Sequence, residues 1–318
     1  MKRTKALLLF SGGLDSILAA KILEEQNIDI TALIFRSCFF DSGKAEKTAK
    51  ELHFKRKNVN FSEDHIRAVK SPFFGYGKGL NPCIDCRIMM LKKAGEIMKK
   101  GKYDFVATGE VLGQRPMSQN RKSLEIIEEK SLLKGFLLRP LSAKLLKETV
   151  PEKLKQVCRE KLLTIEGKSR KNQFNLAKKY RLKHYPNPAG GCLLTDPEFS
   201  KRMKRMKAVC ENFNENDVFL MKTGRHFYCG KSLIVVGRDE KENRKIKKTA
   251  EKGDILVEMK KIKGPLTLVR FYGEKNEAER KIILKESERL TRSYSRKGKS
   301  AKRLEFRIKS AGINFLPF

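Results

Sequence analysis

Two short segments of this sequence have residue types and spacings that could do chemistry. One is the loop Ser11-Gly12-Gly13-Leu14-Asp15-Ser16, and the other, Asn81-Pro82-Cys83-Ile84-Asp85-Cys86-Arg87, carries two thiols at C-x-x-C spacing. An apolar run at residues 5–10 precedes the first segment, and residues 17–25 follow it with helical periodicity. The first segment is therefore predicted to be a turn between a buried strand and a helix, where backbone N–H groups and the helix N-terminus converge on an anion.

The residue types of this turn fit a nucleotide. Gly12 and Gly13 allow the backbone to approach phosphates without Cβ obstruction. The serine hydroxyls add donors, and Asp15 can hold the Mg²⁺ ion that accompanies a nucleotide. The Gly-Lys-Ser/Thr ending of the other common phosphate loop is missing, so transfer of a γ-phosphate is not favoured.

With this turn the sequence resembles the PP-loop (N-type ATP pyrophosphatase) superfamily, whose members cleave ATP between the α and β phosphates. The resemblance implies that the pyrophosphate is held by Ser11, Gly12, Gly13, Asp15 and Ser16. It further implies that the end of the second strand, around Phe35, meets the adenine and that Gly109 lies near the α-phosphate. The segment from Arg139 to Lys144 resembles one that sits over the nucleotide, where a cation could stabilise charge developing on the α-phosphate.

The cysteines form the second candidate site. Cys83 and Cys86 lie where a loop rich in Gly and Pro meets a helix, so the helix N-terminus and Arg87 would lower their pKa. C-x-x-C alone fits a redox pair, half a zinc site or part of an iron–sulfur cluster. Cys192, in Gly190-Gly191-Cys192-Leu193, has an equally unusual setting. Three thiolates suit a [4Fe-4S] cluster with one open iron that could bind sulfide, whereas structural zinc would need a fourth ligand.

The second segment also carries a resemblance. Asn-Pro-Cys-x-x-Cys looks like that of tRNA 2-thiouridylases, and two cysteines with a distant third are similar to cluster-dependent tRNA thiolases of the same superfamily. Two mechanisms follow: Cys83, Cys86 and Cys192 hold a [4Fe-4S] cluster, or one of Cys83 and Cys192 carries a persulfide that the other resolves. The cluster is favoured because the persulfide mechanism leaves Cys86 without a task.

The resemblance is incomplete in two places. The surroundings of Cys192 do not match those of the second cysteine in tRNA 2-thiouridylases, and no N-terminal RNA-binding module precedes the loop as in 4-thiouridine synthetases. The base that is modified, and its position, are therefore left open.

The chemistry-bearing segments need a parallel sheet to position them. Apolar runs at 5–10, 30–35 and 104–108 alternate with helical patterns, which predicts an α/β fold with a parallel sheet covered on both faces, an adenine nucleotide α-hydrolase-like PP-loop domain. Residues 71–86 are predicted to be a long functional loop, and 87–100 a helix. The loop after residue 108 should lie at the ligand-binding edge of the sheet, so candidates for substrate or RNA contacts are Gln114, Arg115, Ser118 and Gln119.

The rest of the chain is basic. Residues 152–183 hold 11 Lys or Arg against three Glu in a helical pattern that residues 185–191 break. Strand-like runs at 232–236, 255–259 and 266–271 indicate a small basic α+β domain. The predicted domains are residues 1–198, residues 199–275 and a basic arm, residues 276–318. The stretch from Lys231 to Asp254 looks like part of the RNA-binding domain of NFACT-type proteins.

The amino-acid composition indicates which kinds of partner the protein binds. The formal net charge of +34 is spread along the chain and implies a polyanion, here tRNA. No segment is long and apolar enough to cross a membrane, and the start of the chain is too short for a signal peptide, so a cytoplasmic protein is expected. Seven cysteines then indicate thiol chemistry, a metal or burial. The sequence does not indicate the oligomeric state.

Together these features predict a tRNA thiolase that uses ATP and Mg²⁺ and takes sulfur from a donor protein or from sulfide. Asp15, Cys83 and Cys192 are the expected catalytic residues. The uridine carbonyl oxygen would attack the α-phosphorus, and sulfur would then displace AMP. The alternatives are a PP-loop amidotransferase or small-molecule ligase, for which the charge would be gratuitous, and a non-catalytic RNA-binding or sulfur-relay protein.

Overall fold

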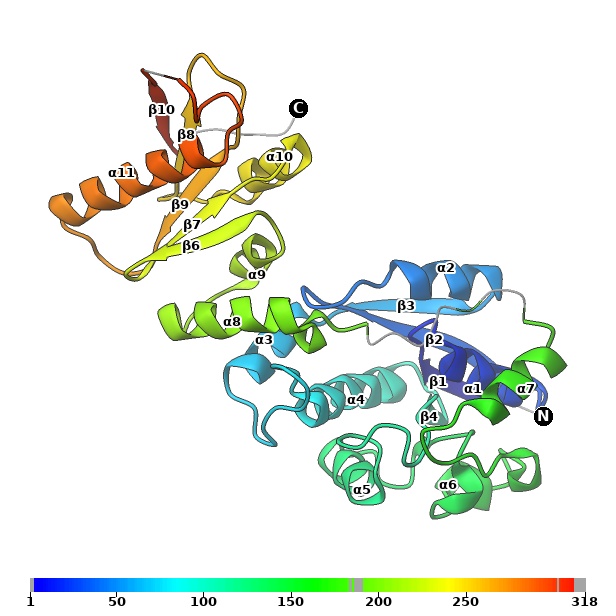
Figure 1. Cartoon of the computed structure of the whole chain (residues 1–318). Coiled ribbons are helices and arrows are strands. Elements are labelled where there is room, and N and C mark those ends of the chain that lie inside the picture. Colours follow the sequence, from blue (N-terminus) through cyan, green and yellow to red (C-terminus); the bar gives the residue numbers. More distant parts are fainter. Residues whose placement is uncertain (1–2, 183–184, 186–190, 302, 312–318) are drawn as a thin grey trace. The chain divides into compact units, whose positions relative to one another are not determined.

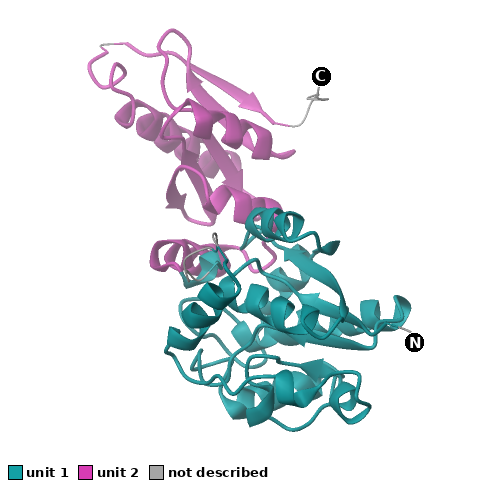
Figure 2. Cartoon of the chain, turned by 90° about the vertical axis from the view of Figure 1, so that its right-hand side faces the viewer, with its two compact units in different colours: residues 1–195 teal, residues 196–318 magenta. Residues whose placement is uncertain are grey.

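The chain forms two compact units, Met1–Thr195 and Asp196–Phe318, in a computed structural model (Figures 1 and 2). The structure describes residues 3–182, 185, 191–301 and 303–311. Most of the break predicted at 185–191 and the last seven residues of the predicted arm, 312–318, lie outside the described residues.

Unit 1 is built on a parallel sheet with the strand order β3-β2-β1-β4-β5. Its strands are β1 (Lys5–Leu9), β2 (Asp29–Arg36), β3 (Lys55–Asn60), β4 (Phe105–Thr108) and β5 (Leu137–Leu138). The central strand β1 is paired on both sides, with Leu7 opposite Thr31 of β2 and Val106 of β4. All four of its apolar residues are buried, as a strand covered on two faces requires.

Helices cover both faces of this sheet. One buried cluster joins β1 and β2 side chains such as Leu8 and Ile34 to α1 (Leu14–Glu24), α2 (Gly43–Glu51) and α7 (Lys171–Lys179). The alternate side chains, such as Leu7 and Leu33, pack on α4 (Cys83–Lys100) and α5 (Arg121–Lys130). The remaining helices of the unit are α3 (Ser62–Lys70), α6 (Val150–Lys153) and the 3₁₀ turns η1 (Ala143–Leu145), η2 (Arg159–Lys161) and η3 (Leu193–Thr195). The predicted α/β class is confirmed.

Two helical predictions differ from the structure in extent. Helix α4 begins at Cys83 rather than at residue 87, so both cysteines of the C-x-x-C pair lie in its first turn. The basic stretch 152–183 is not one helix. Lys155 has φ of 55° and Gly167 has φ of 81°, and such left-handed residues end a right-handed helix, which leaves only short helices on either side.

Unit 2 has an antiparallel sheet with the order β10-β8-β9-β7-β6. Its elements are α8 (Pro197–Val209), α9 (Glu215–Met221), β6 (Arg225–Cys229), β7 (Ser232–Val236), α10 (Glu240–Thr249), β8 (Ile255–Met259), β9 (Thr267–Phe271), α11 (Glu277–Ser293) and β10 (Phe306–Ser310). The residues predicted as an arm supply the last two: β10 pairs with β8, and Ile283 and Leu290 of α11 pack against β7 and β9. The predicted small α+β unit after the parallel-sheet domain is confirmed.

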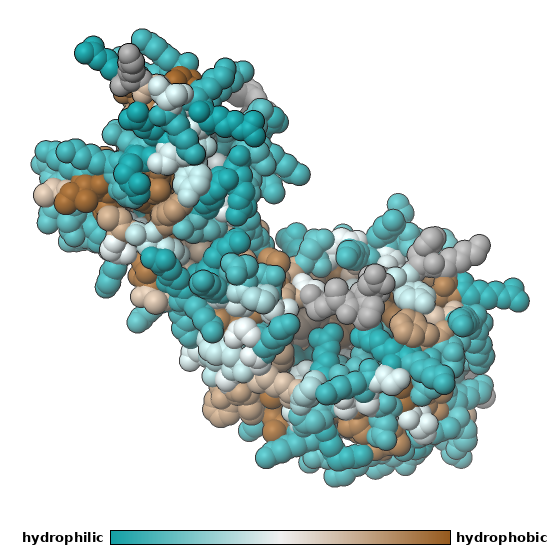
Figure 3. Space-filling view, viewed as in Figure 1, coloured by the Kyte–Doolittle hydropathy of each residue, from teal (hydrophilic) through white to brown (hydrophobic). Residues whose placement is uncertain are grey.

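Hydrophilic side chains cover most of the face of both units that Figure 3 shows. Residues 1–195 carry 39 Lys or Arg against 20 Asp or Glu, and residues 196–318 carry 32 against 17. Each unit is therefore basic by itself. Among the described residues, no helix combines the length and the apolar character needed to cross a bilayer.

A buried ion-pair network holds unit 2 together. Arg270 on β9 is bonded through Nε and Nη2 to Asp254, at 2.9 and 2.6 Å, and through Nη1 to Asp217 on α9, at 2.8 Å. The Tyr272 hydroxyl donates a further bond of 2.7 Å to Asp217. All three charged side chains are less than a tenth exposed, so removing one would leave the others buried without compensation.

We expect Arg270→Ala to destabilise unit 2 by about 3–5 kcal/mol, the usual effect of breaking a buried pair. Arg289→Ala is the matched control, because Arg289 pairs with Glu286 on the exposed face of α11. The measurement is the urea dependence of amide hydrogen exchange on β7 and β9 in the full chain. Equal, small effects of the two substitutions would contradict a structural role for the network.

Candidate functional site

The phosphate loop connects β1 to α1 and depends on Gly12. Its φ of 70° is left-handed, and a Cβ atom built on it would lie 2.8 Å from the Cα of Ala45, in the first turn of α2. No side chain fits in this space. Gly13 is the residue that caps α1, so the free N–H groups of the first turn of that helix open next to the loop.

Hydroxyl groups and a second close approach fix the loop further. The Ser16 Oγ donates to the carbonyl of Gly13 at 2.8 Å, and the Ser11 Oγ lies 3.4 Å from the Ser16 Oγ. At the end of β4, a Cβ atom on Gly109 would lie 2.6 Å from the backbone of Asp15 and of Ser16. The structure therefore brings Gly109 directly against the loop, as a shared site requires.

Asp15 lies in a chain of polar side chains from three elements. Gln114 donates its Nε2 to Asp15 Oδ2 at 2.8 Å, and Gln173 of α7 donates to Gln114 at 3.0 Å. The Arg170 guanidinium lies 3.7 Å from the same carboxylate oxygen. The other oxygen, Oδ1, is buried and has no hydrogen-bond partner among the described residues, so the carboxylate keeps one oxygen for a cation.

Backbone hydrogen bonds bring the third thiol to the other two. The Leu193 N–H donates to the carbonyl of Phe39 at 2.9 Å, and the Leu80 N–H donates to the carbonyl of Leu194 at 3.1 Å. The first bond attaches the segment after Cys192 to the loop that follows β2, and the second attaches it to the loop that precedes Cys83. The three thiols are free. They lie within electrostatic reach of each other, since Cys83 and Cys192 both raise the pKa of Cys86.

Burial controls the protonation of the thiols. It raises the pKa of Cys86 to about 12, with Arg87 opposing the shift, and that of Cys192 to about 11. It also raises the pKa of Cys83, although Arg115 and Arg87 counteract it. The expected lowering by the helix N-terminus is thus outweighed, and the thiols are protonated at neutral pH. Cys83 is the thiol with the most cationic surroundings.

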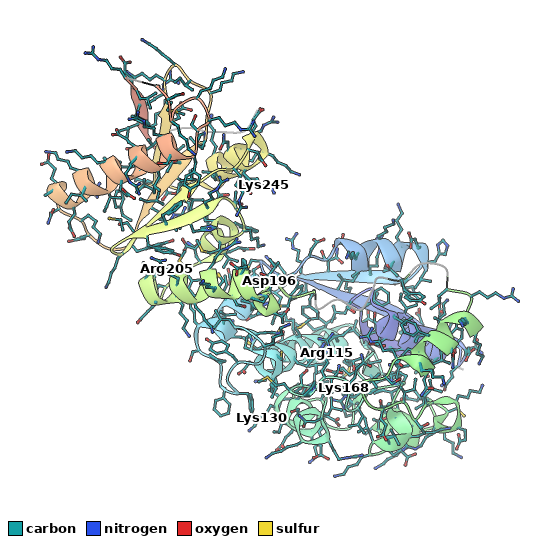
Figure 4. All side chains as sticks on the ribbon, in the orientation of Figure 1. Arg115, Lys130, Lys168, Asp196, Arg205 and Lys245 are labelled. Carbon is teal, nitrogen blue, oxygen red and sulfur yellow. The ribbon has the colours of Figure 1, made fainter. Side chains whose placement is uncertain are left out.

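Arg115 lies between the phosphate loop and the thiols. Its side chain keeps more than a third of its surface exposed, yet desolvation of the guanidinium still lowers its pKa, whereas Cys83 and Asp15 act on that pKa in the opposite direction. Arg115 comes from the loop after β4 of unit 1 (Figure 4). One cation is therefore within electrostatic reach of both halves of the candidate site.

A second buried network supports this region. The Glu110 carboxylate pairs with Arg87 at 3.0 Å and with Arg139 at 3.2 Å, and it accepts a bond from Thr108 at 3.1 Å. Burial acts to raise the pKa of Glu110. The two arginines act in the opposite direction and outweigh it, so the pKa lies below its ordinary value. Glu110 thus holds Arg87 beside the thiol pair.

The remaining predicted site residues lie in the interior. Arg139 is 3% exposed, and its guanidinium is bonded to Glu110, to Glu128 at 2.9 Å and to the carbonyl of Leu124. Phe35 is buried in the core and packs edge-on against Phe61 at 5.7 Å. Ser118 and Gln119 are buried as well.

Three residues of the site were not singled out from the sequence. Arg170 and Gln173 follow the phosphate loop by more than 150 residues, and only the packing of α7 on α1 brings them to Asp15. Glu110 could have been identified from the sequence by one feature, its position directly after a buried strand and Gly109. Among the described residues, no group of three or more His, Cys, Asp or Glu is placed to hold a metal ion.

Two family models match the chain. The model for thiamine biosynthesis protein (ThiI) matches residues 2–160, and the model for the NFACT protein RNA binding domain matches residues 224–315. The second match extends well beyond the stretch from Lys231 to Asp254 and covers most of unit 2.

Relatives of known function match parts of the chain. A probable tRNA sulfurtransferase of Finegoldia magna is 32% identical over 143 residues, which are 44% of this chain and 36% of the relative. A tRNA-specific 2-thiouridylase of Syntrophomonas wolfei is 35% identical over 86 residues, 26% of this chain and 25% of the relative. The chain thus spans between a quarter and a little over a third of the length of these proteins.

Solved structures give weaker matches. A 4-thiouridine synthetase in complex with RNA and ATP has a TM-score of 0.39 at 20% identity, covering 64% of this chain and 50% of that chain. The C-terminal part of a fibronectin/fibrinogen-binding protein from Streptococcus suis has a TM-score of 0.25 at 12% identity, covering 72% and 74%.

We expect the thiols to react slowly with iodoacetamide at pH 7 and faster as the pH rises towards 10, because burial holds their pKa values above neutrality. Arg115→Gln should slow the alkylation of Cys83 several-fold at a given pH, since it removes a cation that lowers the pKa of this thiol. Mass spectrometry of each cysteine gives the rates. The exposed Cys158 is the internal control, and an unchanged rate at Cys83 in the variant would contradict the position of Arg115.

Proposed function

The chain belongs to the ThiI family, whose model matches half of its length, and from this premise we propose that it thiolates uridine in tRNA at the expense of ATP. The resemblance to the PP-loop superfamily, drawn from the loop at Ser11, is confirmed by this membership. The observation that carries the proposal is the position of Arg115, within electrostatic reach of both Asp15 and Cys83. Adenylation and sulfur transfer need one common cavity, and a shared cation supports it.

The nucleotide half is supported by the geometry of the phosphate loop. Gly12, Gly13 and the first turn of α1 offer backbone N–H groups to the pyrophosphate part of ATP, with Ser11 and Ser16 as hydroxyl donors. Asp15 would hold Mg²⁺ through its unpartnered oxygen, and the ion would neutralise phosphate charge.

We assign the cation at the α-phosphate to Arg115 and Arg170 instead of the predicted Arg139, because the Arg139 guanidinium is already bonded to two carboxylates. The uridine carbonyl oxygen attacks the α-phosphorus, the bond to the β-phosphate breaks, and pyrophosphate leaves. A guanidinium beside the α-phosphate stabilises the charge that develops there. The product is an adenylated uridine, whose carbon is open to attack by sulfur.

For the sulfur half, we propose that Cys83, Cys86 and Cys192 would hold a [4Fe-4S] cluster, which would supply a soft metal centre for the incoming sulfide. The type of donor supports it, because the three thiols are soft ligands within electrostatic reach of each other; among the described residues they are not arranged to hold a metal ion, so the cluster would have to draw them together. Arg87 and Arg115 would offset the negative charge of the ligated thiolates. Glu110 keeps Arg87 in place for this purpose.

The persulfide mechanism differs in the fate of the thiols. The outer sulfur of a Cys83 persulfide attacks the adenylated carbon and AMP leaves. The Cys192 thiolate then attacks the Cys83 sulfur, a disulfide forms between the two, and the thiouridine is released. A dithiol reductant must reduce the disulfide before the next turnover. Cys86 has no part in these steps.

Unit 2 would bind the tRNA backbone. It matches an RNA-binding family and carries 32 Lys or Arg against 17 Asp or Glu. Arg205 of α8 and Lys245 of α10 are among its exposed cations (Figure 4). Such contacts bind phosphates with little preference for sequence. An amidotransferase or a small-molecule ligase would have no use for this unit.

We expect Cys192→Ala to abolish thiolation of tRNA and to leave ATP affinity unchanged, because Cys192 belongs to the sulfur half of the site. The assay combines tRNA-dependent release of pyrophosphate with mass analysis of tRNA nucleosides. Cys158→Ala, at an exposed cysteine away from the site, is the control.

Two results would count against this proposal. An equal loss of ATP affinity in Cys192→Ala would remove Cys192 from the sulfur half. Pyrophosphate release by the unaltered protein that does not respond to tRNA, together with unmodified tRNA, would remove the function itself.

We further expect protein purified without oxygen to be brown and to contain about four iron atoms per chain. Cys86→Ser should then lose both iron and thiolation. If the protein is instead colourless, free of iron and active, and if Cys86→Ser keeps its activity, the persulfide mechanism replaces the cluster.

A further inference from the structure

An exposed aromatic ring lies in the loop that leads to the thiols. Phe73, in the loop between α3 and α4, is 84% exposed, more than any other large hydrophobic side chain among the described residues. Phe74 beside it packs against the core of unit 1, and the two ring centroids are 4.9 Å apart at 71°. In Figure 3 a hydrophobic area appears at the lower left of unit 1, where Figure 1 places this loop.

The backbone under the ring is fixed by a buried carboxylate. Asp85 is 9% exposed, and its two oxygens accept the N–H groups of Phe73 and Phe74, at 2.8 and 3.1 Å. These charge-assisted bonds hold the loop in one conformation. The ring is therefore presented to solvent by a rigid support, although it contributes little to the core.

The same carboxylate ties the ring to the chemistry. Asp85 lies between Cys83 and Cys86 in the first turn of α4. Farther along the loop, a Cβ atom on Gly77 would lie only 3.5 Å from the Cys83 sulfur. The loop thus borders the thiols on one side and carries the exposed ring on the other.

The charges of the chain segment that holds the ring favour a nucleic acid over a protein. Residues 65–95 include six Lys or Arg and one carboxylate, the buried Asp85. Arg67, Arg87 and Lys93 are paired with carboxylates outside this segment, whereas Lys78 and Lys92 have no ion pair with a carboxylate among the described residues. Lys78, in the loop itself, is exposed. An exposed ring among cations is the combination that binds unpaired nucleotides, with the base on the ring and the phosphates on the cations.

We propose that Phe73 stacks on an unpaired base of the tRNA next to the uridine that is modified, and that Asp85 is the positioning residue for this platform. The proposal rests on the function proposed above. It adds a determinant of substrate selection outside both halves of the site. Stacking of the neighbouring base on Phe73 would hold the flipped-out uridine close to the thiols. Contacts with phosphates alone cannot direct the uridine to that position.

The chain contains no tryptophan, which permits a direct test. Phe73→Trp introduces a single tryptophan, whose fluorescence should be quenched when bulk tRNA is added, because a stacked base quenches an indole. Leu154→Trp is the matched control at another exposed hydrophobic position of unit 1, 63% exposed, and should not be quenched.

Affinity gives an independent readout. Phe73→Ala should raise the Kd and the KM for tRNA by about 5- to 100-fold, the range found for one stacked base, with ATP affinity unchanged. Phe73→Trp should retain both. Asp85→Asn, made in the Phe73→Trp background, should shift the quenching to higher tRNA concentrations.

The outcomes separate this inference from the function on which it rests. If the unaltered protein thiolates tRNA but neither quenching at position 73 nor loss of affinity in Phe73→Ala is seen, the platform is overturned and the function stands. If Phe73→Ala binds tRNA normally and loses activity only with a protein sulfur donor and not with sulfide, the ring is a protein-docking site and the proposal is overturned. If the unaltered protein neither binds nor thiolates tRNA, both fail.

Discussion

The site depends on two places where backbone meets backbone without room for a side chain. Gly12 lies against the first turn of α2, and Gly109 lies against Asp15 and Ser16, with space in both cases only for a hydrogen where other residues carry Cβ. Because β1 and β4 are adjacent parallel strands, their carboxyl ends meet at one edge of the sheet. The close contact at Gly109 then fixes the loop after β4, which carries Glu110, Gln114 and Arg115, relative to the phosphate loop.

A series of polar and charged side chains leads from this contact to the thiols. Asp15 is bonded to Gln114, Arg115 is within electrostatic reach of both Asp15 and Cys83, and Glu110 pairs with Arg87, which follows Cys86. The groups that raise the pKa of Arg115 are the Asp15 carboxylate and the Cys83 thiol, which must become a thiolate to act as a nucleophile. Binding of a nucleotide or of a metal would therefore change the protonation of the other half of the site.

The sequence was sufficient for the parts that depend on local pattern. The apolar runs predicted β1, β2 and β4, and β7 and β8 occur at the predicted residues, because a buried strand needs continuous apolar side chains. Strand β3, whose sequence is Lys-Arg-Lys-Asn-Val-Asn, was missed, since a charged edge strand has no such pattern. Arg170 and Gln173 could not be found, because their role comes from long-range packing. The unusual setting of Cys192 suggested a thiol site, but the sequence could not show the backbone bond from Leu80 to Leu194, which joins its segment to the loop before Cys83.

The distribution of charge also bears on where selectivity must arise. Both units are basic, so contacts with phosphates are available over much of the chain, and such contacts set affinity and its dependence on salt without identifying a base. The proposed thiolation nevertheless requires that one uridine among many be selected. The groups in unit 1 that can distinguish it are those that do not pair with phosphate, namely the exposed ring of Phe73 and the half-buried amide of Gln114. Selection of the target should therefore reside in unit 1, and unit 2 should increase the affinity for tRNA in general.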